Sequence, residues 1–176
     1  MDQQTNDEGY NPETAKVVME LATKEYSNEN DRNKSIDTKT GPMIAATGAA
    51  MLFVAGIFSR PPQDLPPFWA GVYFSGVCLV LACLLTAQVF FFQVLRTRRF
   101  GRVKVASWTD EATLRDEPER IRGQLASTYE KAIAANSAIN ETKARNHDVG
   151  LMLLTVAIVL LAFVLVASQI VPELIQ

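Results

Sequence analysis

Three long uncharged stretches interrupt an otherwise polar chain, at residues 40–59, 65–95 and 149–172. A helix of about 20 mainly apolar residues is long enough to cross the hydrocarbon core of a bilayer, and each stretch reaches that length. No charged residue lies inside any of the three. The pattern therefore predicts an all-α membrane protein with three transmembrane helices.

The polar segments before the first and third stretches also predict helices. Asn11-Pro12-Glu13 is typical of a helix start, with a capping residue, a proline at the first helical position and an acid in the first turn. Gly41-Pro42 predicts that this helix stops or kinks, because proline lacks an amide hydrogen and crowds the preceding turn. Pro118 opens another polar helix, which we expect to run into the third span as a near-continuous helix of about 50 residues.

The expected elements follow one another along the whole chain. They are a disordered N-terminus (1–11), a polar helix (12–40), transmembrane helix 1 (42–59), an external turn (60–67), transmembrane helix 2 (68–95), a basic connector (96–117), a second polar helix (118–148) and transmembrane helix 3 (149–171).

The second polar helix carries a weak heptad seam. Its semi-apolar positions alternate in steps of four and three, which is the spacing of helices that pack along a shared seam. Those positions are Ile121, Leu125, Thr128, Ala132, Ala135, Ile139 and Thr142.

The basic residues predict the topology. Sixteen of the 17 Lys and Arg residues lie in 1–42 and 96–149. Since basic residues stay on the cytoplasmic side, both polar helices are expected to be long cytoplasmic extensions, with the N-terminus inside and the C-terminus outside. A dense basic group marks the cytoplasmic exit of the second span, where it would either act as a topology signal alone or bind anionic lipid headgroups, with nucleic acid less favoured. Its members are Arg96, Arg98, Arg99, Arg102 and Lys104.

Small residues in the spans predict helix packing, because they let helix backbones approach closely where lipid provides no hydrophobic drive. The first span contains Gly48 and Ala49. In the second span small residues follow at steps of four, three, four and four, and this stripe is expected to face a neighbouring helix. The stripe consists of Gly71, Ser75, Cys78, Ala82 and Thr86.

Polar side chains gather where the polar helices meet the membrane. Asp37 and Lys39 precede the first span, where they would either couple the polar helix to the span or form ordinary solvated charge. Two residues apart on one helix, each would pair with another helix rather than with its neighbour. On the second polar helix Asn136, Asn140, Lys143 and Asn146 would either fix the register of a helix pair or form a solvated face. The single histidine, His147, is expected to be a flanking residue, not a zinc ligand.

The sequence offers little chemistry. Ionisable groups at membrane depth mark ion paths and proton relays, so their absence argues against a pump or coupled transporter. No phosphate-binding glycine loop, nucleophile motif or pair of catalytic carboxylates is present. We expect no enzyme activity, no cofactor and no metal site.

Two stretches resemble a known family. One is NDRNKSIDTKTGPMIAATGAAMLFV (30–54), in which Asp37 and Lys39 enter a small-residue span; the other is TYEKAIAANSAINETKARNHDVGLMLLTVAI (128–158), which carries Tyr129 and Lys143. This layout is similar to the small bacterial three-span proteins typified by the Pycsar effector transmembrane family. The resemblance implies antiviral defence, in which a nucleotide signal or a partner protein triggers assembly and impairs the inner membrane.

Three hypotheses follow. The first is a helical protein of the bacterial inner membrane that self-associates as a homo-oligomer and acts as the membrane-disrupting effector of an antiphage system. A cytosolic sensor or a nucleotide-synthesising partner would then trigger it. The alternative is a membrane anchor or scaffold, whose cytoplasmic helices dock a soluble partner without breaching the bilayer. A channel ranks third, because the polar residues in the spans are few and scattered.

Overall fold

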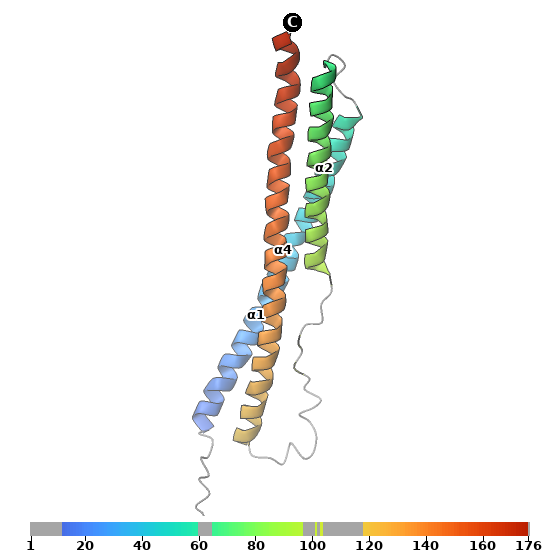
Figure 1. The fold of residues 1–176 in the computed structure, drawn as a ribbon. Coiled ribbons are helices and arrows are strands. Elements are labelled where there is room, and N and C mark those ends of the chain that lie inside the picture. The colour runs from blue at the N-terminus through green and yellow to red at the C-terminus, as the bar shows by residue number, and fades with distance from the viewer. Residues whose placement is uncertain (1–11, 60–64, 97–100, 102, 104–117, 176) are drawn as a thin grey trace, which may run out of the picture. The chain divides into compact units, whose positions relative to one another are not determined.

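The structure is a computed structural model that describes residues 12–59, 65–96, 101, 103 and 118–175, with side chains up to Ile170. These residues form three helices, α1 (Pro12–Phe58), α2 (Pro67–Leu95) and α4 (Pro118–Ile175) (Figure 1). Each is long and apolar enough to cross a membrane, which confirms an all-helical protein with three candidate spans. The predicted N-terminal disorder, most of the external turn and most of the basic connector lie outside the described residues.

Helix α1 does not end at Gly41-Pro42. It runs for 47 residues with Pro42 in its interior, so the stop that the sequence suggested does not occur. Proline removes only one backbone hydrogen bond, and packing on both sides of it can keep a helix continuous, as membrane helices often show. The prediction of a near-continuous helix through the third span is confirmed, since α4 runs for 58 residues.

The chain divides into two compact units, each built from segments distant in sequence. The helix-pair unit comprises Met1–Asn33 and Arg98–Asn140, and the spanning unit comprises Lys34–Thr97 and Glu141–Gln176. Helices α1 and α4 contribute a segment to each unit.

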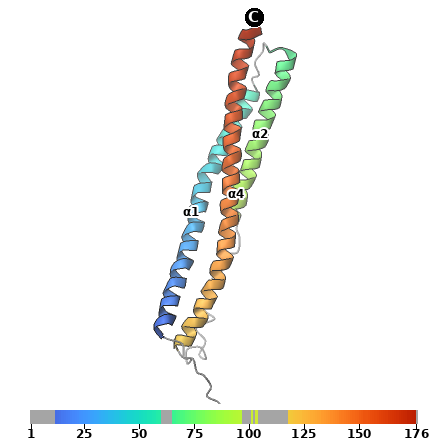
Figure 2. The ribbon, with the colours of Figure 1, turned by 60° about the vertical axis from the view of Figure 1, so that its left-hand side comes forward.

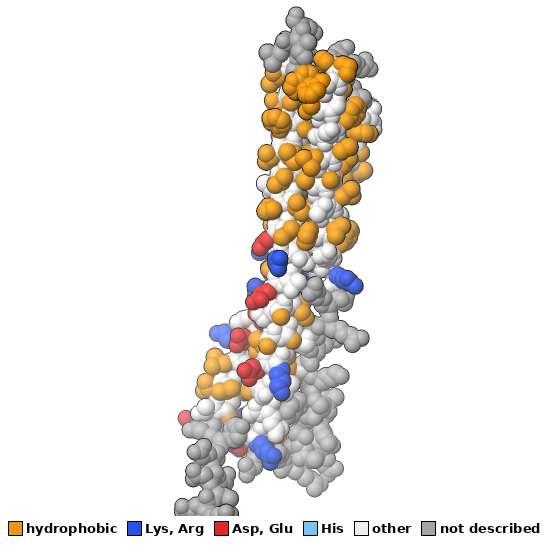
Figure 3. All heavy atoms as spheres, viewed as in Figure 1, with side chains coloured by type: hydrophobic (Ala, Val, Ile, Leu, Met, Phe, Trp, Pro, Cys, Tyr) orange, Lys and Arg blue, Asp and Glu red, His pale blue; other side chains and the backbone are white. Residues whose placement is uncertain are grey.

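In the spanning unit, α2 runs opposite to α1 and α4, and the three helices lie side by side in both views (Figures 1 and 2). A common core joins them, with Val54 from α1, Val77 and Phe91 from α2, and Leu154 from α4. Large apolar side chains also cover the outside, as Figure 3 shows for one face. Examples are Leu52, Phe53, Phe68 and Phe163, which are 58–77% exposed. An apolar exterior of this extent fits a lipid surrounding, so this is a multi-pass membrane protein.

Buried positions repeat every three or four residues along α2. They are Tyr73, Val77, Val80, Leu84, Ala87, Phe91 and Val94. Because α2 is apolar on all sides, hydrophobicity alone could not reveal this face.

The inner face of α2 excludes the small-residue stripe. Gly71, Ser75, Cys78, Ala82 and Thr86 are all exposed, so no described helix of this chain covers them, and the packing of this stripe against another helix stays a prediction. The larger apolar residues fill the space between helices instead. In the first span Gly48 is half-buried and Ala49 is exposed.

The buried seam of α4 lies one residue beyond the predicted one. Ala126, Asn136, Asn140 and Lys143 are buried, whereas the expected seam residue Ala135 is exposed. The prediction followed apolar residues, but polar side chains occupy much of the true seam.

Candidate functional site

A row of polar side chains follows one face of α4 in steps of four, three and four: Asn136, Asn140, Lys143 and His147. The first three are buried, and His147 is half-buried. Buried polar groups are costly unless they are hydrogen-bonded, so their partners decide what the row does.

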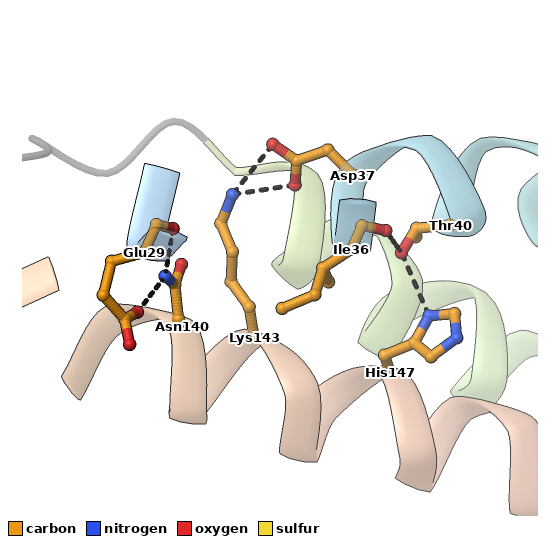
Figure 4. Close-up of polar contacts among 7 residues, drawn as sticks. All are labelled: Glu29, Ile36, Asp37, Thr40, Asn140, Lys143 and His147. Carbon is orange, nitrogen blue, oxygen red and sulfur yellow. Dashed lines mark hydrogen bonds and ion pairs between the residues drawn. The ribbon is translucent and has the colours of Figure 1, made fainter. Parts of the chain in front are cut away.

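In the spanning unit, the Lys143 ammonium donates two hydrogen bonds to Asp37 on α1. Its Nζ lies 2.8 Å from Asp37 Oδ1 and 3.0 Å from Oδ2 (Figure 4). The Lys143 side chain is 8% exposed, and that of Asp37 is 37% exposed. The pair thus holds a nearly water-free cation against a carboxylate that still reaches solvent.

One turn further, Thr40 meets His147. The Thr40 hydroxyl donates to the carbonyl of Ile36 and lies 3.0 Å from His147 Nδ1. Because the hydroxyl proton is already used, its oxygen accepts from the imidazole, and the contact requires a proton on Nδ1. The ring of Phe91 on α2 also lies near this imidazole, with the two ring centroids 5.9 Å apart.

In the helix-pair unit, Asn140 holds α1 through Glu29. Its Nδ2 donates to the Glu29 carbonyl oxygen at 2.8 Å and to Oε2 at 2.6 Å. The Asn140 Oδ1 is buried without a partner among the described atoms. The amide orientation is nevertheless fixed, because a flipped amide would aim an oxygen at two other oxygens.

The Asn136 side chain hydrogen-bonds to both the amide and the carbonyl group of Gly101. Its Oδ1 accepts from the Gly101 amide at 2.7 Å, and its Nδ2 donates to the Gly101 carbonyl, which also accepts from the Tyr26 hydroxyl. A Cβ atom at Gly101 would lie 3.2 Å from Asn136 Oδ1 and 3.4 Å from the Ala132 backbone. A side chain at this position would therefore crowd the amide group that binds the Gly101 backbone.

A family model described as the Pycsar effector protein domain matches residues 21–168, a range that includes every α1–α4 contact given above. The chain belongs to this family. The resemblance seen in the sequence is thereby confirmed. Membership in the Pycsar effector family implies an antiphage defence effector that acts at the membrane. No curated protein and no solved structure matches the chain.

In this Pycsar-family chain some of the predicted site residues contact residues of another helix, and others do not. Asp37 pairs with another helix, as its spacing suggested, whereas Lys39 is exposed and bonds to no described residue. Asn136, Asn140 and Lys143 are buried, so they do not form a solvated face, and Asn146 contacts Gln93 at 3.4 Å. Arg96 is exposed, and Arg98, Arg99, Arg102 and Lys104 lie outside the described residues.

Sequence reasoning missed several partners in the row. Thr40 was not singled out, and Glu29, Tyr26 and Gly101 were not connected with α4. One signal was available: the 3.5-residue spacing that joins Asn136, Asn140 and Lys143 also reaches His147. Taken as one seam, it would have marked His147 as an inward-facing residue.

Proposed function

We propose that this protein is the membrane-disrupting effector of an antiphage system in the bacterial inner membrane, and that it self-associates when triggered. The family match over 21–168 carries the proposal. We further propose that the N-terminus is cytoplasmic and the C-terminus external, as the basic residues indicate.

The trigger would be a nucleotide signal sensed by a partner, or the partner itself. Helices α1 and α4 each continue from the helix-pair unit into a span. A helix transmits displacement along its axis because its backbone hydrogen bonds are continuous. The Asp37–Lys143 pair and the Thr40–His147 contact favour a joint movement of α1 and α4 where they enter the spans.

Self-association would use the small-residue stripe of α2, which the fold leaves uncovered. A Cβ atom added at Gly71 or at Gly48 would meet no atom within 4 Å. Inside lipid such faces favour close contact between helices of different copies.

Inducible expression with a membrane-potential dye tests the effector function. Cells with the complete defence system should lose potential after phage challenge, and cells lacking the triggering system should not. Normal dye signal and growth with the system fully active would refute membrane disruption.

A scaffold that docks a soluble partner without breaching the bilayer is the second candidate. The open apolar groove of the helix-pair unit favours it. Crosslinking in intact membranes separates the two, since a scaffold gives a fixed hetero-complex with no homo-oligomer and no loss of potential.

A further inference from the structure

The helix-pair unit contains a groove that none of the described residues fills. It has a volume of about 730 Å³ and lies between residues 14–25 of α1 and 123–134 of α4. Small residues form its floor, among them Ala15, Ala22 and Ala126. A floor of this kind admits side chains from a third element.

The wall on α1 is apolar and open. Val18 and Leu21 line the groove and are 46% and 61% exposed, and Val17 beside them is 53% exposed. Among its described residues the helix-pair unit buries mainly alanine and asparagine, namely Ala15, Ala126, Asn136 and Asn140. A pair of helices cannot bury the outer faces of both, so no described residue of the unit covers the apolar side chains on the α1 side of the groove.

Two carboxylates stand at the edge of the groove. Glu25 and Glu130 line it from opposite helices, and neither makes a hydrogen bond or ion pair with a described residue. The two glutamates lie at about the same height along the helix pair. Their sequence neighbours Tyr26 and Tyr129 meet edge to face, with ring centroids 5.3 Å apart. A molecule in the groove would therefore contact two acidic groups and an apolar wall.

The charge pattern disfavours a second copy as the occupant. The sequences Lys24-Glu25-Tyr26 and Tyr129-Glu130-Lys131 mirror each other, so across the groove the charges run basic, acidic, acidic, basic. Copies that thread one bilayer lie parallel, and a two-fold axis would set α1 against α4 of the other copy. Glu25 would then face Glu130 of the other copy, which is repulsive.

A lipid surface fits poorly as well. Residues 12–33 of α1 carry five acids against three bases, and membrane surfaces that attract proteins electrostatically are anionic. A helix with apolar side chains three and four residues apart, and a basic residue at the level of the two carboxylates, fits this lining better than either.

We infer that this groove binds an amphipathic helix of a different protein, and that a lysine or arginine of that helix pairs with Glu25 and Glu130. The inference rests on the proposed function in one respect, namely that the effector responds to a partner. It gives that partner a defined binding mode.

Site-specific photocrosslinking of the full chain in cells carrying the defence system tests this directly. A benzophenone amino acid at Leu21 should form an adduct with a second protein. The same probe at Thr23, which is exposed about half a helix turn away, should not. Sequencing of the crosslinked segment should show apolar residues spaced three and four apart and a lysine or arginine beside them.

Charge reversal then tests the pairing. Glu25→Lys together with Glu130→Lys should lower the adduct yield about tenfold or more, and Glu substituted for the partner's basic residue should restore it. The matched control, Lys24→Glu with Lys131→Glu, should leave the yield close to that of the unmodified chain.

An adduct with a second copy of this chain, an adduct with lipid, or equal labelling from Leu21 and Thr23 would each overturn the inference. So would a yield that charge reversal leaves unchanged. Crosslinking does not depend on membrane damage. A negative result here, with normal loss of potential by the dye assay, would leave the effector function standing.

Discussion

Lys143 and Asp37 are removed from water to different degrees, with side chains 8% and 37% exposed. Removing one partner of a buried pair is costly when the charge that remains is buried. The two single substitutions should therefore have unequal effects, although they break the same interaction.

We predict that Asp37→Asn destabilises the protein by about 3 kcal/mol, because the buried ammonium loses its carboxylate. Lys143→Met should cost only about 1 kcal/mol, since Asp37 still reaches solvent. Thermal unfolding in detergent measures both values, and the double variant should recover most of the loss. Equal costs for the two single variants would contradict this account of the pair.

Gly150 sets the approach of α4 to α2. A Cβ atom there would lie 2.6 Å from Phe91 Cε1, whereas one at Gly71 would meet nothing within 4 Å. We predict that Gly150→Ala destabilises the spanning unit by about 1–3 kcal/mol through overpacking. Gly71→Ala should instead be neutral or stabilising by up to about 1 kcal/mol, because alanine favours helix. Unfolding of the two variants under identical conditions checks that only Gly150→Ala lowers the stability.

At the scale of the element, α1 tolerates a proline that the sequence suggested would end or bend it. Pro42 is exposed, so its replacement disturbs no packing. We predict that Pro42→Ala leaves the fold intact and adds about 1 kcal/mol of stability, because the new amide can donate to the Thr38 carbonyl. Circular dichroism and unfolding in detergent measure the effect. A loss of helix would show that the proline shapes α1 in a way its continuous course does not reveal.

The polar row of α4 explains why the predicted seam was displaced. Seam prediction assumes that buried positions are apolar, and here Asn136, Asn140 and Lys143 occupy them. Their polar atoms are stabilised by Gly101, Glu29 and Asp37, all distant in sequence. The periodicity of a single helix contains no information about such partners. The predicted seam therefore had the correct spacing of four and three residues but lay one residue away from the buried positions.

At the scale of the whole molecule, the uncovered stripe of α2 bears on self-association. Ser75→Leu adds bulk at an exposed position, so the single chain should still fold. We predict that Ser75→Leu, alone or with Gly48→Leu, lowers the oligomer size on a detergent column. Leu79→Ile, at another exposed position of α2, serves as the control. Unchanged oligomer size would exclude this face from assembly.

The topology has its own test. Protease added outside intact spheroplasts should remove a tag placed after Gln176 and spare one placed before Met1, because basic residues favour the cytoplasm. The opposite result would invert the orientation and would place the helix-pair groove beyond the reach of a cytosolic partner.

The sequence by itself determined the class of protein and its family. Bilayer thickness sets a minimum apolar length, and three uncharged stretches meet it, so the spans are evident without any contact between them. The two polar helices were also evident, because proline and capping residues mark where they begin.

Only the tertiary structure decided which faces turn inward. The sequence of a span that is apolar on all sides does not reveal which face is buried. In α2 the buried face consists mainly of larger apolar residues, and the small-residue stripe is exposed. The ion pair between Asp37 and Lys143 joins residues 106 positions apart, and the groove at Glu25 and Glu130 likewise depends on how α1 and α4 meet. Contacts over such distances depend on the register between helices, which local sequence does not encode.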